Sequence, residues 1–276
     1  MIDWVLTPLE FEFMQRAMIA ALLVGITCAV FSCFLVVKGW SLMGDAVSHS
    51  VLPGLALAYI AGWPLIIGAF AAGLICSLAT GYIKDHSRVK EDAVLGIMFS
   101  GMFAFGLVLL TKIETDIHLL HVLFGNILGV GWADIHEIAA LTIPLLMILA
   151  VKWRDLMLYV FDPNHAKAVG LPINVLHYGL LIFLSLTIVA SIKAAGIILV
   201  IAMLIAPGAT GYLLTSCFQK MLFIAVAVSV VSCTAGTLAS FHLDVATAPL
   251  IVVAQAAIFT LALLFAPKKG LIRWQS

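Results

Sequence analysis

The sequence predicts an all-α integral membrane protein, a polytopic bundle of eight or nine transmembrane helices. The chain of 276 residues is 64% hydrophobic and only 10% charged, whereas a soluble domain carries roughly 25% charged residues. Long apolar runs recur along the whole chain, and lysines and arginines gather in alternate connections between them. Because no linker or low-complexity segment divides the chain, residues 1–276 are expected to form a single transmembrane domain.

The apolar runs are judged against the roughly 20 residues that a membrane-spanning helix needs. The run 50–83 is too long for one span and is expected to split at Gly62-Trp63-Pro64 into two. The shortest candidate, 45–61, could instead be partly re-entrant, and the total would then be eight rather than nine. The other spans are expected, in order, at about 17–37, 93–111, 133–152, 174–192, 194–216, 221–240 and 245–266.

Orientation follows from the lysines and arginines, which favour cytoplasmic loops. With the C-terminal segment PKKGLIRWQS in the cytoplasm, nine spans place eleven of these residues on the cytoplasmic side. The other side receives only three, namely Arg16, Lys112 and Lys193. The first residues would then lie outside, and they lack the basic segment that begins a secretory signal.

Two ionisable residues occur at the start of the 45–61 candidate, among residues apolar enough for lipid. Asp45 and His49 are four residues apart, so a helix places both on one face. A carboxylate and an imidazole in this arrangement can bind one divalent cation, and charged groups at membrane depth normally face a polar path or a partner. The alternative is that Asp45 only interacts with the helix N-terminus near the cytoplasmic surface.

Proline-glycine pairs interrupt two predicted spans, one in each half of the chain. The residues are Pro53 and Gly54 in the first half and Pro207 and Gly208 in the second. Proline removes a backbone hydrogen bond from a helix, and interrupted spans in both halves are typical of a transport path. We therefore expect helix breaks at these four residues, with a simple packing kink as the alternative.

Possible metal ligands crowd the connection after the 93–111 span, on the predicted outer side. Glu114 lies four residues before His118, and His118 and His121 form an H-x-x-H pair. The functional interpretation is an outer vestibule that attracts or relays metal. The alternative is a polar external loop, which continues through Asp134, His136 and Glu137.

A short helix with well-defined ends is predicted on the cytoplasmic side at about 162–170. Asp162 suits the N-cap and Pro163 the first helical position. Gly170 suits the position after the last turn, and Pro172 stops any continuation. A surface helix specified in this way indicates a docking element for a cytoplasmic partner, and an ordinary structured loop is the alternative.

The chain contains no nucleophile elbow, H-E-x-x-H, P-loop or Rossmann glycine pattern. It is therefore not expected to be an enzyme, and active transport would need an ion gradient or a separate ATP-hydrolysing subunit. A net charge of zero gives no indication of a nucleic-acid partner. The five cysteines lie in or beside apolar runs without a C-x-x-C pair, and buried hydrophobic side chains are expected.

Three segments resemble the permease subunits of metal-ion ATP-binding-cassette importers, the zinc, manganese and iron permease family. They are GWSLMGDAVSHSVLPG, FDPNHAKAVGLP and AAGIILVIAMLIAPGATGYLL. Within the family the chain is most similar to manganese and iron permeases. The resemblance covers about 14–271, and one departure is the pair of glycines at Gly208 and Gly211, where alanine-like residues are expected.

The resemblance implies a homodimer in the bacterial inner membrane, with the path for Mn²⁺ or Fe²⁺ at its interface. Asp45 and His49 match the positions that handle the cation in the path. Two cytoplasmic ATPase subunits would each dock on a short coupling helix, and Asp162, Pro163, His165, Ala166 and Gly170 match that helix. An extracytoplasmic binding protein would deliver the metal, which is cargo, so no permanently bound cofactor is expected.

A dimer would also supply more ligands to the metal ion than one chain does. One carboxylate and one imidazole under-coordinate Mn²⁺, which favours oxygen-rich, roughly octahedral sites. Two copies would double the set. The alternatives that remain are a zinc-import permease of the same family, a gradient-driven secondary metal carrier that uses Asp45, and, least favoured, an intramembrane enzyme.

Overall fold

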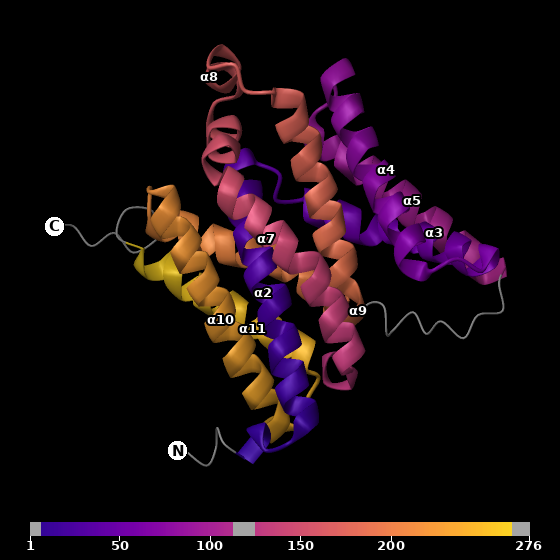
Figure 1. Ribbon diagram of the computed structural model, residues 1–276, viewed down its shortest axis with the longest axis vertical. Coiled ribbons are helices and arrows are strands. Elements are labelled where there is room, and N and C mark those ends of the chain that lie inside the picture. The colour runs from indigo at the N-terminus through magenta and orange to yellow at the C-terminus, as the bar shows by residue number, and fades with distance from the viewer. Residues whose placement is uncertain (1–6, 113–124, 267–276) are drawn as a thin grey trace.

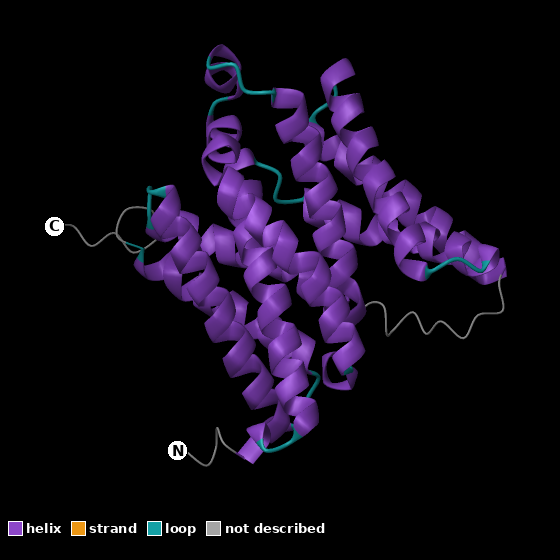
Figure 2. Cartoon of the chain, in the orientation of Figure 1, coloured by secondary structure: helices purple, strands orange, loops and turns teal. Residues whose placement is uncertain are grey.

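The computed structural model describes residues 7–112 and 125–266, which form helices joined by short connections (Figure 2). No strand occurs within these two ranges, and the all-α prediction is confirmed. The helices are α2 (Glu12–Lys38), α3 (Met43–Ala61), α4 (Leu65–His86), α5 (Glu91–Lys112), η1 (Ile127–Gly129), α7 (Trp132–Phe161), α8 (Pro163–Ala168), α9 (Ile173–Leu214), α10 (Phe218–Leu243) and α11 (Thr247–Phe265).

Helix α9 is the centre of the bundle. Helices α2, α7, α10 and α11 lie on one side of it, and α3, α4 and α5 lie on the other (Figure 1). It packs against all of these except α5, which contacts α3 and α4. The fully buried large side chains come mainly from α2 and α9, among them Phe31, Phe34, Leu35, Leu184 and Ile188. The apolar residues on the outside of the bundle are those that lipid would cover.

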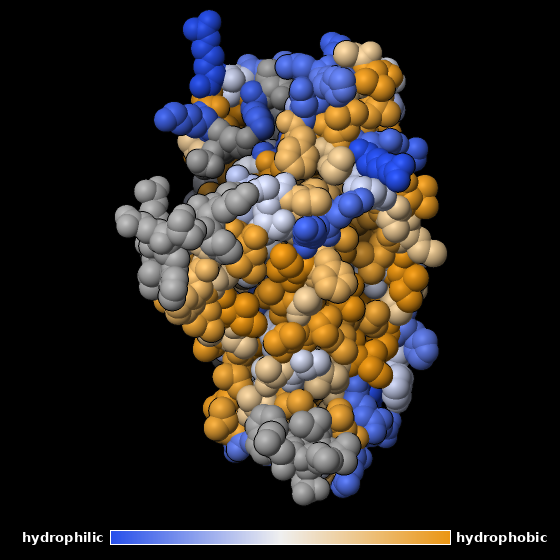
Figure 3. Space-filling view, turned by 90° about the vertical axis from the view of Figure 1, so that its left-hand side faces the viewer, coloured by the Kyte–Doolittle hydropathy of each residue, from blue (hydrophilic) through white to orange (hydrophobic). Residues whose placement is uncertain are grey.

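The surface agrees with a protein that crosses a bilayer. On the face that Figure 3 shows, hydrophobic side chains form a broad middle zone, and hydrophilic residues gather mainly towards the two ends. Seven of the described helices have the length and hydropathy of a membrane span. Helix α9 counts once among them although it has 42 residues. Helix α3 is not included, since Asp45 and His49 lower its hydropathy.

The boundary predicted near Lys193 occurs three residues later, at Gly196. Its backbone is non-helical, with φ 73° and ψ 166°, a region that glycine enters readily. Gly125 lies against this point, and a Cβ on Gly125 would collide with the backbone of Ala195 and Gly196. The connection that precedes α7 is therefore seated on the break in α9.

The helix breaks predicted at the proline-glycine pairs do not occur. Helix α3 continues through Pro53 and Gly54, and α9 continues through Pro207 and Gly208. A proline inside a helix frees one carbonyl group, but in a bundle neighbouring helices can satisfy it or pack closely against the distortion. The pairs are kink and packing positions within continuous helices, the alternative that the sequence left open.

The glycines of these pairs allow close helix contacts instead. A Cβ on Gly54 would collide with the Gly68 carbonyl, so α3 and α4 meet backbone to backbone there. The Gly208 N–H donates to Ser32 Oγ at 2.9 Å, and the same hydroxyl donates to the Ile205 carbonyl at 3.2 Å. Ser32 of α2 thus forms hydrogen bonds with the α9 backbone on both sides of Pro207.

Candidate functional site

Asp45 and His49 lie together in the first turns of α3, as their spacing predicts. Asp45 Oδ1 is 3.3 Å from His49 Nε2, and the side chains are 37% and 20% exposed, respectively. Asp45 occupies the first turn of α3, where a negative charge also interacts favourably with the helix dipole. The two side chains therefore present one carboxylate and one imidazole at a partly open surface.

Two aromatic rings of α5 fix the orientation of this imidazole. The ring centroids of Phe99 and Phe103 lie 4.9 and 5.3 Å from that of His49, and both contacts are edge-on. His49 Nδ1 is buried and has no hydrogen-bond partner among the residues that the structure describes. The imidazole is thus held by ring packing, with Nε2 directed at Asp45.

Sequence reasoning missed this aromatic support. Phe99 and Phe103 are four residues apart, a spacing that places both rings on one face of α5. That spacing was a usable signal, but only the packing of α5 on α3 shows which face it meets.

One chain alone does not build a complete metal site in the described part of the structure. Within 7–112 and 125–266, no group of three or more histidine, cysteine, aspartate or glutamate side chains is placed to hold an ion. The Asp45–His49 pair supplies two ligand groups, fewer than a six-coordinate Mn²⁺ requires. Further ligands would have to come from beyond these described side chains.

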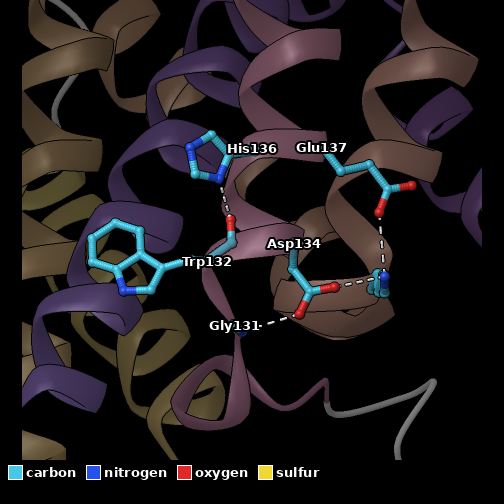
Figure 4. A network of polar contacts seen from close by, with 6 residues as sticks. Gly131, Trp132, Asp134, His136 and Glu137 are labelled. Atoms are coloured by element: carbon cyan, nitrogen blue, oxygen red, sulfur yellow. Dashed lines mark hydrogen bonds and ion pairs between the residues drawn. The ribbon is translucent and has the colours of Figure 1, made fainter.

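The outer candidates divide into two groups. Glu114, His118 and His121 lie outside the described residues. Asp134 and Glu137, near the start of α7, are engaged with Lys193 of α9 (Figure 4). Lys193 Nζ is 2.6 Å from Asp134 Oδ1 and 3.2 Å from Glu137 Oε2.

This polar network ties the start of α7 to the break in α9. The second carboxylate oxygen of Asp134 accepts the Gly131 N–H at 3.0 Å, and His136 Nδ1 lies 2.6 Å from the Trp132 carbonyl oxygen (Figure 4). The acidic groups therefore have a lysine and a backbone amide as partners, which favours a structural role over metal binding for this part of the loop. The sequence did not predict that Lys193 pairs with them.

The short helix predicted at 162–170 is present as α8, and its ends have the expected geometry. Asp162 Oδ1 accepts the N–H groups of Asn164 and His165, both at 3.0 Å, and Pro163 is the first helical residue. At the other end Gly170 has φ 86°. Helix α8 projects at one extreme of the molecule, between α7 and α9 (Figure 1).

One buried residue anchors this helix. Ala166 is fully buried, whereas most of its neighbours on α8 are exposed. The Leu171 N–H donates to the Ala166 carbonyl at 3.0 Å, which ties the residue after Gly170 back to α8. The rest of α8 is left on the surface, where another protein can contact it.

Comparison with known proteins identifies the family. A model of the ABC 3 transport family matches residues 10–266. The chain is 56% identical over 258 residues to the chelated iron transport system membrane protein YfeD of Yersinia pestis, covering 94% of this chain and 87% of that one. It is 49% identical over 269 residues to the manganese transport system membrane protein MntB of Synechocystis sp., covering 98% of this chain and 88% of that one.

Solved structures agree with this fold. PsaBC from Streptococcus pneumoniae, solved in complex with Fab, is similar with a TM-score of 0.87 and 36% identity, and the match covers 98% of each chain. An inward-facing putative metal-chelate type ABC transporter has the same fold, with a TM-score of 0.71 and 18% identity over 90% of this chain and 84% of that one. The resemblance stated from the sequence is confirmed, and the chain belongs to the ABC 3 transport family.

Proposed function

We propose that the chain is the permease subunit of an ATP-binding-cassette importer that moves manganese or ferrous iron into the cytoplasm. The observation that carries this proposal is the Asp45–His49 pair, 3.3 Å apart and partly exposed in a helix that is otherwise apolar. Ionisable groups in such helices are costly and normally serve a path or a partner. The relatives named for iron and manganese transport support the choice of cargo.

Two copies of the chain complete the metal site in this proposal. A two-fold axis beside α3 would bring together two carboxylates and two imidazoles, and water could fill the remaining positions. That set suits Mn²⁺ or Fe²⁺. The ion is cargo, so the site binds it weakly enough to release it, and no permanent cofactor is involved.

The energy comes from a separate ATPase subunit, which docks on α8. The capped geometry of α8 supports this role, because Asp162 and Gly170 fix both ends of a helix whose surface faces outward. The chain itself is not an enzyme. ATP-driven closure of two ATPase subunits would push on α8 and switch the path from outward-facing to inward-facing.

The proposed topology places α8 and the C-terminus in the cytoplasm. Within 7–112 and 125–266, seven helices qualify as spans. Counting the two halves of α9 separately and adding α3 gives nine, or eight if α3 is re-entrant. Lys38 and Lys84 lie at the same end as α8, where both line a cavity with Pro163, in accord with the positive-inside rule. An extracytoplasmic metal-binding protein would deliver the ion at the opposite end, in the bacterial inner membrane.

The deciding experiment replaces the carboxylate without changing its shape. Asp45→Asn removes the charge that holds the cation, so ATP-dependent uptake of radioactive manganese into proteoliposomes containing the complete transporter should fall to background. The matched control is Asp155→Asn, which removes a carboxylate of similar exposure, 3.2 Å from Lys152, and should leave uptake unchanged. Normal uptake by the Asp45→Asn transporter would contradict the proposed metal path.

A further inference from the structure

A hydrogen bond joins the two helices on either side of α8. Tyr159 lies in the last turn of α7, three residues before the Asp162 cap, and His177 lies in the second turn of α9. The Tyr159 hydroxyl is 2.7 Å from His177 Nδ1. Tyr159 is only 3% exposed, so this contact lies inside the bundle. The hydrogen bond therefore joins α7 and α9, the two helices that flank α8 in the chain.

The same pair contacts the segment that leads into the metal-path helix. Lys38 Nζ lies 4.1 Å from the centre of the Tyr159 ring, a cation–π geometry. The Trp40 ring meets His177 edge-on at 5.3 Å, and Trp40 is 2% exposed. The four residues Lys38, Trp40, Tyr159 and His177 are called the hinge cluster below.

The hinge cluster is close in the chain to Asp45. The Met43 N–H donates to the Trp40 carbonyl at 3.0 Å, which closes the turn directly before α3. Asp45 occurs two residues later, in the first turn. A displacement of the indole would therefore shift the backbone that positions the carboxylate, because only a two-residue turn separates Trp40 from α3.

The hinge cluster borders a cavity of about 200 Å³. The cavity is lined by Lys38, Trp40, Lys84, Tyr159 and His177, together with Pro163, Ile173, Asn174 and Tyr178. Pro163 is the first residue of α8. The cavity thus borders both the base of α8 and the aromatic rings, so the packed core does not enclose the cluster on every side.

We propose that the hinge cluster transmits the displacement of α8 to α3, so that Tyr159 and His177 are positioning residues for the metal path. This inference rests on the proposed function, in which an ATPase subunit moves α8. The physical route is a chain of direct contacts, from the Tyr159–His177 hydrogen bond to Trp40 and then to the first turn of α3. Motion at α8 changes the position of Asp45, and the Asp45–His49 pair opens or closes accordingly.

The test uses Tyr159→Phe, which removes the hydroxyl and keeps the ring beneath Lys38. In proteoliposomes containing the complete transporter, ATP hydrolysis and manganese uptake are measured on the same sample. The number of manganese ions moved per ATP should fall about three- to tenfold, in the range that one hydrogen bond of ordinary strength gives. His177→Leu, which removes both the hydrogen-bonding nitrogen and the imidazole that meets Trp40, should lower the same ratio.

The matched control is Tyr178→Phe, which deletes a hydroxyl at the edge of the same cavity and should keep the wild-type ratio. An unchanged ratio in Tyr159→Phe would overturn the proposal. Uptake and hydrolysis that fall together, in step with a loss of intact transporter on size-exclusion chromatography, would also overturn it, because the cluster would then be structural only. If the wild-type transporter shows no ATP-dependent metal uptake, the proposed function itself fails, and the two failures are thereby distinguished.

Discussion

At the residue scale, the main feature of the candidate site is that aromatic rings contact the His49 imidazole, while Asp45 is its one polar contact described above. The imidazole meets Asp45 through Nε2, and it packs edge-on with the rings of Phe99 and Phe103. A metal-binding histidine is commonly oriented by a hydrogen bond from its second nitrogen. Here Nδ1 has no such partner among the described residues, so aromatic packing takes over the orienting role.

Phe103→Leu is expected to weaken manganese binding to the purified transporter by roughly tenfold, the lower end of the range for changes that reposition a metal-binding histidine. Leucine keeps an apolar contact but lacks the flat ring edge that fixes the imidazole. Competition with a fluorescent chelator measures the affinity. Phe223→Leu on α10, where the phenylalanine is 77% exposed, is the control and should bind manganese normally. Equal affinities for both variants would show that ring packing does not orient His49.

At the scale of single elements, α8 is specified by its own ends. The Asp162 carboxylate closes the N-terminus, and Gly170 reverses the chain with φ 86°. A Cβ on Gly170 would meet no atom within 4 Å. Any effect of a substitution there therefore comes from the backbone conformation and not from a steric clash.

Gly170→Ala should uncouple ATP hydrolysis from transport while leaving manganese binding intact. A non-glycine residue in the left-handed region costs about 1–2 kcal/mol, which loosens the end of α8 that the ATPase subunit would contact. Gly179→Ala is the control, since Gly179 lies in α9 with open space around it and an ordinary φ. A wild-type ratio of manganese moved to ATP consumed in Gly170→Ala would contradict this role for the end of α8.

At the scale of the whole molecule, the proposed metal site draws on two copies of the chain. One carboxylate and one imidazole meet in each chain, and no larger ligand group is found in 7–112 and 125–266. The arrangement of α3, α4 and α5 on one side of α9 leaves large apolar side chains of these helices exposed (Figure 1). They include Leu57, Ile60, Ile75, Ile97 and Phe105.

The purified transporter is accordingly expected to bind one manganese ion for every two permease chains. Equilibrium dialysis of the protein against radioactive manganese, with the metal counted on both sides of the membrane, gives the ratio directly. The Asp45→Asn transporter, treated in parallel, should retain no manganese above background. A ratio of one ion per chain would contradict the shared site and would require a complete ligand set within each subunit.

Local rules account for the parts that the sequence predicted well. The span 93–111 lies within α5, and the division at Gly62-Trp63-Pro64 separates α3 from α4, because lipid requires long apolar helices and turn residues interrupt them. The ends of α8 were predictable because an N-cap side chain bonds the N–H groups two or three residues further on. The Asp45–His49 pair was predictable because residues four apart share a helix face.

The features that the sequence predicted wrongly or did not predict all depend on contacts between residues far apart in the chain. The break expected at Pro207 is absent. Ser32, far away in the chain, forms hydrogen bonds with the backbone on both sides of this proline. Lys193 forms ion pairs with Asp134 and Glu137, which are at least 56 residues away in the chain. No spacing rule relates such residues, because the packing of separate helices brings them together.

The sequence by itself determined that the chain crosses the membrane as helices, where α8 begins and ends, and that Asp45 and His49 share a face. These properties follow from hydropathy and from contacts within one or two helical turns. Only the tertiary structure decided that Phe99 and Phe103 hold the imidazole and that the prolines leave their helices continuous. It also placed Tyr159 and His177 against the segment that leads into α3, since such contacts between helices depend on how the whole bundle packs.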